Sequence, residues 1–219
     1  MSEATLIITS KNYGSWSLRG WLLARMAGLD FREQVIPPDD PSMRAELLLL
    51  APSYLIPCLV HEDLRIWDTL AIAEYLHEVR PKAGLLPKDR ADRARCRSIC
   101  GEMHQGFSAL RSSMPMNIRA RHPGYVPHSG ARADIERITT IWRDCLERSK
   151  GPYLFGGLTM ADAMYAPVVT RFVTWDVKLD PASAAYAKRI LEWPAMAEWI
   201  AAATQEPEEV PEFEDGILA

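Results

Sequence analysis

The sequence predicts two domains, a small α/β domain over residues 1–80 and an all-helical bundle over residues 90–204. In the first part, short apolar runs typical of strands alternate with the three-to-four-residue apolar spacing of helices. Prolines and glycines interrupt this pattern over residues 81–89, which predicts a linker. Beyond the linker the apolar spacing is helical, with no convincing strand. An α/β domain followed by an all-α domain accounts for the whole pattern.

The first domain is predicted to have the element order βαβαββα. Its first strand is short, β-branched and apolar, and the first helical pattern ends at Gly28. Pro37-Pro38 ends the second strand, and Pro52 follows the second helix. Two short apolar runs across a polar turn then predict a hairpin that leads into the third helix. The expected strands are residues 4–9, 31–36, 58–60 and 64–67, and the expected helices are residues 18–27, 43–50 and a segment that starts at Asp68.

Five helices are predicted in the second domain, at residues 90–110, 131–150, 159–173, 181–191 and 194–203. Thr159 and Asp162 have the spacing of a capping box, in which the two side chains satisfy free backbone N–H groups at a helix start. Pro194 suits the first turn of the last helix. Residues 205–219 are acidic and rich in proline, which predicts a solvated tail.

Two features close together in the first domain predict a ligand site. Pro57 begins an apolar run where the chain cannot donate a hydrogen bond, a position that suits a sheet edge or a cis peptide bond and leaves backbone groups free. Asp68 and Thr69 precede an apolar helical stripe, so they form the helix cap. The helix start and the Thr69 hydroxyl would hold a carboxylate, and Asp68 would face an ammonium. The site therefore suits the head group of an α-amino acid.

Charge and composition exclude several classes of partner. A net charge of -4 and a pI near 5.8 leave no basic excess for a nucleic acid backbone. No apolar run approaches the roughly 20 residues that a membrane-spanning helix needs, and the first residues lack the pattern of a secretion signal. We therefore expect a cytoplasmic protein with neither a membrane nor a nucleic acid as partner.

The four cysteines do not predict a metal site or a disulfide scaffold. Cys58, Cys96, Cys100 and Cys145 lack CxxC spacing, so we expect reduced thiols. Cys96, Cys100 and His104 recur every four residues, but eight residues of helix rise about 12 Å, which is too far for one tetrahedral ion. The pattern instead indicates one buried stripe of a long helix.

Several motifs occur in an order and spacing typical of one enzyme family. They are Ser-Trp-Ser-Leu-Arg at residues 15–19, Ile56-Pro57, Asp68-Thr69 with the helix that follows, and the capping box at Thr159. On these motifs the chain resembles the cytosolic glutathione S-transferases over nearly its whole length. The resemblance implies a thioredoxin-like N-terminal domain, glutathione as co-substrate, no metal, and a homodimer that acts in detoxification.

The resemblance also implies which residues bind glutathione. The backbone of Ile56, next to Pro57, would pair with the cysteinyl part of the tripeptide. Asp68 and Thr69 would hold its γ-glutamyl head, in agreement with the independent reading of these residues as a helix cap. The glutathione site is therefore expected at the end of the loop before residue 58 and at the start of the last helix of the first domain.

Ser15 is the expected hydrogen-bond donor to the glutathione sulfur, as in serine-type members of the family. Ser17 and Tyr13 are alternatives, and either serine could instead cap the helix. A free thiol has a pKa of roughly 8.5. Lowering this pKa by one unit corresponds to stabilising the thiolate by about 1.4 kcal/mol. Gly14 stands at one of the places where some serine-type members have this hydroxyl. Residues 13–17 contain no cysteine, which excludes a thiol mechanism of the thioredoxin kind.

Trp16, Met103, Phe107 and Arg111 are the candidate residues of a site for a small apolar electrophile. Trp16 would shape the pocket wall, and the Met and Phe side chains adapt to irregular shapes, although core packing is the favoured explanation for each of them taken singly. The leading function is transfer of glutathione to this electrophile. The alternatives are a glutathione-dependent isomerase of the maleylacetoacetate or maleylpyruvate type, and a non-catalytic protein that binds ligands on the same fold.

Overall fold

The structure is a computed structural model that describes residues 4–36 and 55–207. The first domain contains a four-stranded mixed sheet with the strand order β2-β1-β3-β4, in which β1 is parallel to β2 and antiparallel to β3. This is the predicted thioredoxin-like arrangement, and the expected helix at 43–50 lies outside the described residues. The elements are β1 (Ala4–Ile8), α1 (Ser15–Met26), β2 (Phe31–Val35), β3 (Cys58–His61), β4 (Leu64–Trp67) and α3 (Thr69–Val79).

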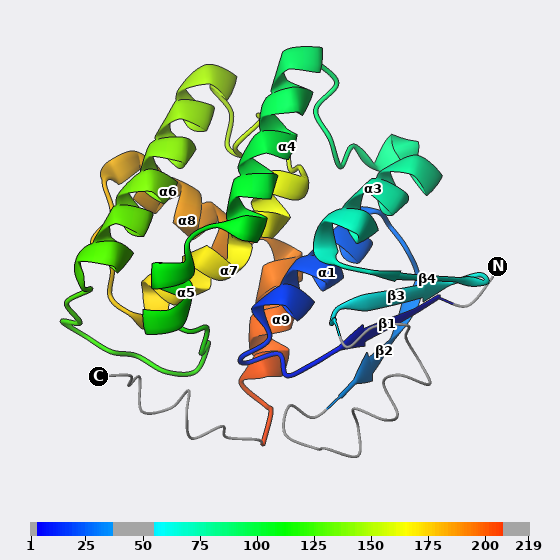
Figure 1. Ribbon diagram of the computed structural model, residues 1–219, viewed down its shortest axis with the longest axis horizontal. Coiled ribbons are helices and arrows are strands. Elements are labelled where there is room, and N and C mark those ends of the chain that lie inside the picture. Colours follow the sequence, from blue (N-terminus) through cyan, green and yellow to red (C-terminus); the bar gives the residue numbers. More distant parts are fainter. Residues whose placement is uncertain (1–3, 37–54, 208–219) are drawn as a thin grey trace.

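The second domain is all-helical, as predicted, and lies beside the helices of the first domain. Figure 1 shows α1 and α3 on one side of the sheet, with α7 and α9 next to α1. The two domains are joined by a segment that contains a 3-10 turn, η1 (Pro81–Ala83). The helices are α4 (Arg90–Gln105), α5 (Ser108–Ser113), α6 (Ser129–Ser149), α7 (Met160–Thr174), α8 (Pro181–Glu192) and α9 (Pro194–Ala203).

The prediction of one helix over residues 90–110 is wrong, because α4 ends at Gln105 and α5 begins at Ser108. Gly106 is extended, and Phe107 has a left-handed backbone with φ 59°. The new helix is held by a tertiary contact, since Asp134 of α6 accepts a hydrogen bond of 2.9 Å from the Leu110 N–H. Apolar spacing continues across the break and therefore could not reveal it.

The capping box at the start of α7 is confirmed, and it ties three parts of the second domain together. Asp162 is fully buried and accepts hydrogen bonds from the N–H and hydroxyl of Thr159, the N–H of Leu154 and the hydroxyl of Tyr186. Burial raises the pKa of Asp162 to about 6, while these four donors act in the opposite direction. The carboxylate stays ionised at neutral pH and fixes the start of α7 against α8.

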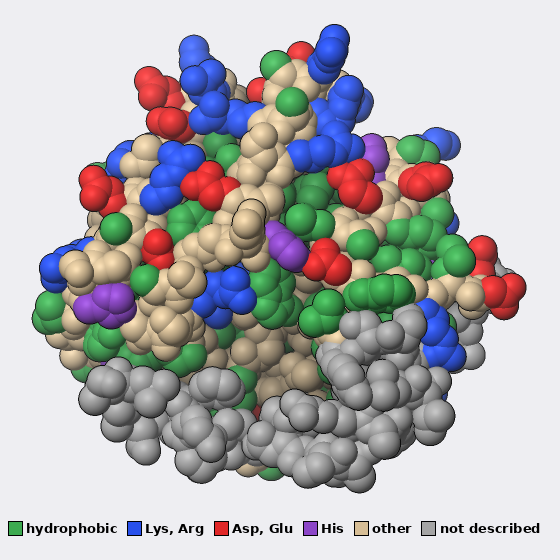
Figure 2. Space-filling view, in the orientation of Figure 1, with side chains coloured by type: hydrophobic (Ala, Val, Ile, Leu, Met, Phe, Trp, Pro, Cys, Tyr) green, Lys and Arg blue, Asp and Glu red, His purple; other side chains and the backbone are tan. Residues whose placement is uncertain are grey.

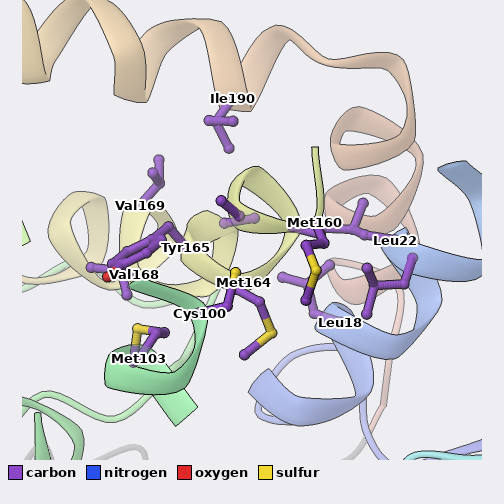
Figure 3. Close-up of a cluster of buried hydrophobic side chains, with 14 of the residues drawn as sticks. Leu18, Leu22, Cys100, Met103, Met160, Met164, Tyr165, Val168, Val169 and Ile190 are labelled. Atoms are coloured by element: carbon purple, nitrogen blue, oxygen red, sulfur yellow. The ribbon is translucent and has the colours of Figure 1, made fainter. Parts of the chain in front are cut away.

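Helix α7 is the centre of the hydrophobic core. Of its 15 residues 14 are buried, so it packs against neighbours all round its axis. Figure 3 shows its side chains between those of α1, α4 and α8. The labelled residues are Met160, Met164, Tyr165, Val168 and Val169 of α7, Leu18 and Leu22 of α1, Cys100 and Met103 of α4, and Ile190 of α8.

Near the start of the expected acidic tail, Gln205 and Pro207 are exposed, whereas Glu206 is half-buried and held by hydrogen bonds. The Glu206 carboxylate accepts hydrogen bonds from the Ser10 hydroxyl (2.6 Å) and the N–H groups of Lys11 (2.5 Å) and Asn12 (2.9 Å). These contacts place the end of the helical domain on the loop between β1 and α1. The rest of the predicted tail, residues 208–219, lies outside the described residues.

Gly20 allows α1 to approach the segment that contains Pro57. A Cβ atom at Gly20 would lie 2.5 Å from Pro57 Cγ, whereas a Cβ at Gly101 in α4 would meet no described atom within 4 Å apart from its own stretch of helix. We expect Gly101→Ala to stabilise the protein by about 0.5–1 kcal/mol, because alanine favours a helix. Gly20→Ala has the same propensity gain but must displace a rigid ring, so we expect a net loss of about 1–3 kcal/mol. Urea unfolding of both variants measures the difference, and equal stabilities would contradict the close approach.

Candidate active site

A pocket of about 280 Å³ collects the residues predicted to bind glutathione. It is formed by both domains, since the loop before β3 and the starts of α1 and α3 face the end of α4 and helix α5. Of the residues from the helical domain, Arg111 is a candidate from the sequence analysis, whereas His104 is not. Its lining residues are Trp16, Leu55, Ile56, Pro57, Asp68, Thr69, His104 and Arg111.

The Ile56-Pro57 peptide bond is cis, which is one of the two predicted possibilities. The other possibility, a position on a sheet edge, is not realised, because β3 lies between β1 and β4. Pairing between β3 and β1 begins only at Cys58, opposite Ile7. The Ile56 backbone therefore lies outside the sheet ladder, and Ile56 is one of the residues that line the pocket.

Asp68 caps α3 as predicted, and its backbone is strained. Its Oδ1 atom accepts hydrogen bonds from the N–H groups of Leu70 (2.8 Å) and Ala71 (3.3 Å). Its φ of 76° is rare for a residue with a side chain and is typical of functional positions. The adjacent Thr69 hydroxyl is buried and finds no hydrogen-bond partner among the described residues. An unsatisfied donor at a helix start is suited to an anionic ligand group.

His104 is a residue of this pocket that the sequence analysis assigned only to a buried helix stripe. Its Nε2 atom donates to Asp68 Oδ2 over 2.5 Å, and its ring lies 5.2 Å from the Trp16 ring. The contact joins the last turn of α4 to the cap of α3, and so joins the two domains at the pocket. One histidine at the end of a helix carries no sequence signal for such a contact.

A second pocket, of about 470 Å³, lies next to the first. Trp16 and Arg111 line both pockets, so the two spaces adjoin. Figure 2 shows this face hollowed between α5 and α1, with basic side chains at the hollow. The lining residues of the second pocket are Tyr13, Ser15, Trp16, Ser108, Arg111, Ser112, Pro115, Met116 and Arg171.

The two candidate serines have different surroundings. Ser15 is the first residue of α1 and lines the second pocket, where its Oγ atom accepts a hydrogen bond of 3.2 Å from Arg171. Ser17 is buried and accepts a hydrogen bond of 2.9 Å from the Thr9 N–H. The residue at the N-cap is Gly14, and no side chain caps α1, so neither serine has that role.

Steric crowding explains why the residue at position 14 is a glycine. A Cβ atom at this position would lie 2.4 Å from the Ser10 carbonyl oxygen and 2.6 Å from the Thr9 hydroxyl oxygen. Both distances are far below van der Waals contact, so no side chain fits in this loop conformation. A serine at position 14 would therefore require a different path of the chain between β1 and α1.

Three arginines gather behind and beside Ser15. Arg19 and Arg111 lie on the Trp16 ring, with their guanidinium carbons 4.4 and 5.0 Å from its centroid. Arg171 is 4% exposed, and burial followed by repulsion from Arg111 lowers its pKa to about 10. Burial, with repulsion from the other two arginines, lowers the pKa of Arg19 well below its usual value. Arg19 and Arg171 had no role in the sequence analysis beyond the motif that contains Arg19.

Met103 and Phe107, the other two candidates for the electrophile site, lie in the hydrophobic core. Met103 is fully buried on the face of α4 toward α7, and Phe107 is 7% exposed at the helix break. Neither lines the two pockets described above. Core and cleft residues cannot be told apart on this stripe from the sequence, because both give the same apolar spacing.

Among residues 4–36 and 55–207, no group of three or more His, Cys, Asp or Glu side chains is placed to hold a metal ion. In the same part of the chain, no helix has the length and apolar character needed to cross a membrane. The four cysteines are buried free thiols.

Comparison with known proteins shows the family. The chain matches the model of the glutathione S-transferase N-terminal domain over residues 13–79 and that of the C-terminal domain over residues 91–202. These matches span more than half of the chain, and the protein belongs to the glutathione S-transferase family.

Similar curated proteins carry two kinds of name. Rat (Rattus norvegicus) maleylacetoacetate isomerase is 28% identical over 171 residues, which are 76% of this chain and 77% of that protein. Glutathione S-transferase 1 of Dianthus caryophyllus is 28% identical over 163 residues, 73% of each chain.

Solved structures agree on the fold. A Burkholderia glutathione transferase homologue with bound glutathione gives a TM-score of 0.71 at 20% identity, over 92% of this chain and 98% of that one. A Tau class glutathione S-transferase from mango (Mangifera indica) gives 0.67 at 20% identity, over 92% and 96%. At this identity the likeness establishes the architecture alone.

The contact between His104 and Asp68 leads to a prediction for glutathione affinity. His104→Leu removes the donor that orients Asp68, and both side chains are about one-third exposed. We therefore expect only a modest rise in the glutathione Kd, about fivefold. His104→Gln keeps an N–H donor and is expected to stay near the wild-type value. Calorimetric titration measures both, and equal affinities for the Leu and Gln variants would show that the contact does not orient Asp68.

Proposed function

We propose that this protein activates glutathione as a thiolate and transfers it to a small electrophile. The observation that carries the proposal is the junction of the two pockets. One pocket offers a helix start, the unpaired Thr69 hydroxyl and the Ile56 backbone, and the other offers the Ser15 hydroxyl. The proposed site holds the γ-glutamyl carboxylate at Thr69 and its ammonium at Asp68. A tripeptide held there would direct its thiol toward Ser15.

Ser15 is the proposed donor to the thiolate. Because its Oγ atom accepts from Arg171, its own hydrogen is available to the sulfur. Ser17 is a weaker candidate, since its hydroxyl is occupied by Thr9 away from both pockets. Tyr13 lines the second pocket, but its hydroxyl accepts a hydrogen bond of 3.3 Å from Arg119.

The electrophile is proposed to bind in the second pocket, between Trp16 and Arg111. Catalysis then consists of thiolate stabilisation and the proximity of the two substrates. The thiol proton first passes to solvent. The thiolate sulfur then forms a bond to an electrophilic carbon, and the electron pair of the bond broken at that carbon departs with a leaving group such as chloride. The proposal includes a cytoplasmic homodimer without a metal and a role in detoxification, as the family resemblance implies.

A glutathione-dependent isomerase is the second candidate function, and the names of the relatives favour it. In that reaction glutathione adds to an activated double bond, the adduct rotates about the resulting single bond, and elimination regenerates the thiol. The same thiolate and the same Ser15 hydroxyl would serve both reactions. A non-catalytic binding protein is the third candidate, and it predicts no turnover of either kind.

Replacing Ser15 tests the assignment of the sulfur donor. Ser15→Ala removes a hydrogen bond to a charged group, so we expect the pKa of bound glutathione to rise by about one unit, worth about 1.4 kcal/mol. Ser17→Ala is the matched control, since it loses a hydroxyl two residues away that contacts Thr9. The ultraviolet absorbance of the bound thiolate, followed against pH, gives both values. An unchanged pKa in Ser15→Ala would refute the assignment.

Product analysis separates the three candidate functions. With an aryl chloride, a transferase yields the S-aryl conjugate and chloride. With a cis-enoic acid such as a maleyl compound, an isomerase yields the trans acid and leaves the glutathione concentration unchanged. We expect conjugation to be the faster reaction, measured as kcat/KM for each substrate. Rearrangement without conjugation would favour the isomerase, and glutathione binding without either product would favour the non-catalytic protein.

A further inference from the structure

The pocket beside Ser15 has positive charge that the described part of the protein does not neutralise. Among the described residues, no Asp or Glu forms an ion pair with Arg19, Arg111 or Arg171. Arg19 and Arg171 are 1% and 4% exposed, so water does not compensate for the missing partner. Buried charges without a counterion are rare, because desolvation costs far more than packing returns.

The hydrogen bonds of the two buried arginines leave donors unused. Arg171 donates to the carbonyls of Met114 and Pro167 and to the Ser15 hydroxyl, which accounts for three of the five N–H groups of a guanidinium. The Arg19 Nη2 atom is buried and has no partner among the described residues. Arg171 lines the pocket, whereas Arg19 lies behind Trp16 and contributes only its charge.

Arg111 completes the cationic wall. It lines both pockets, stacks on Trp16 from the side of α5, and repels both buried arginines. Its side chain is half-buried, so it can turn toward a ligand in either pocket. Two guanidinium groups that face one space, with a third behind it, form a site that selects a planar anionic group such as a carboxylate.

We propose that the pocket beside Ser15 binds electrophiles that carry a carboxylate, which Arg111 and Arg171 hold while the glutathione sulfur attacks. This inference rests on the proposed function and adds the substrate class, and it applies to conjugation and isomerisation alike. An anionic electrophile explains why arginines line a pocket that would otherwise suit neutral aromatic compounds.

A matched pair of substrates tests the inference. In 4-chloro-3-nitrobenzoate and its neutral amide, the thiolate sulfur forms a bond to the carbon that bears chlorine, chloride leaves with the bonding electron pair, and the thiol proton passes to solvent. Each kcat/KM is divided by the rate constant of the uncatalysed reaction with glutathione. We expect the wild-type enzyme to favour the carboxylate at least tenfold on this scale.

Substitution of Arg111 is the main variant, because this side chain is half-buried and its loss leaves no described backbone group unpaired. We expect Arg111→Gln to reduce the preference for the carboxylate at least tenfold, and Arg111→Lys to retain part of it. Arg189→Gln, an exposed arginine of α8 outside both pockets, removes the same charge and should keep the preference. Two outcomes would overturn the inference. One is an equal normalised kcat/KM for the two substrates in the wild type, and the other is an unchanged ratio of these two values in Arg111→Gln.

A second measurement removes the dependence on turnover. Calorimetry compares two S-conjugates of glutathione, one with a 4-carboxy-2-nitrophenyl group and one with the corresponding amide. Tighter binding of the carboxylate conjugate, lost in Arg111→Gln, supports the inference. Equal binding of the two conjugates overturns it but leaves the glutathione site intact. Failure of glutathione itself to bind overturns the proposed function and this inference together.

The alternative role of the arginines is to stabilise the glutathione thiolate, which is the other anion in the proposed site. In that case Arg111→Gln would raise the pKa of bound glutathione and lower both reaction rates by the same factor. An unchanged thiolate pKa together with a changed substrate ratio assigns the cations to the carboxylate. A raised pKa with an unchanged ratio assigns them to the sulfur and overturns the inference.

Discussion

The packing of α1 against α7 is the contact on which the site depends. Helix α7 is held at its start by the buried carboxylate of Asp162, and its axis runs through the core beside α1. This arrangement brings the last turn of α7 to the first turn of α1, where Arg171 meets Ser15. Arg19, one turn further along α1, donates to the Met164 carbonyl of α7 over 2.8 Å. The hydroxyl proposed for catalysis therefore belongs to one domain and is oriented by the other.

The contact between α1 and α7 also buries two arginines, and burying their charges lowers the stability of the fold. Arg19 and Arg171 are held by carbonyl oxygens of α7, of the start of α1 and of Met114, which offset only part of the desolvation of a guanidinium. The lowered pKa values of both groups express this deficit. Apolar side chains of similar volume would fill the space at lower cost. The substrate carboxylate proposed above would regain part of this lost interaction.

Local chemistry was predictable from the sequence, and long-range contacts were not. The cap formed by Asp68, the capping box of Asp162 and the special peptide before Pro57 each depend on neighbouring residues, so each leaves a local pattern. The break at Phe107 depends on Asp134 of another helix, and the role of His104 depends on a cap 36 residues earlier. The spacing of apolar residues along the sequence carries no signal for such long-range contacts. The role of Arg171 was equally unpredictable. A single arginine in an apolar helix indicates neither how deeply its side chain is buried nor which group it contacts.

The loop between β1 and α1 shows how the site is kept rigid without ligand. Its backbone is fixed by the helical domain, since Glu206 accepts from Ser10, Lys11 and Asn12, and Trp199 donates to the Lys11 carbonyl over 2.9 Å. Ser17 closes the loop onto Thr9, and the absence of a side chain at Gly14 lets the chain turn between them. These contacts therefore hold Ser15 at a defined position at the start of α1. A hydroxyl that is already ordered costs no conformational entropy when the sulfur arrives, so its full interaction energy goes to the thiolate. The contacts of Trp199 and Glu206 thus reach the proposed chemistry through this loop, although neither residue lines either pocket.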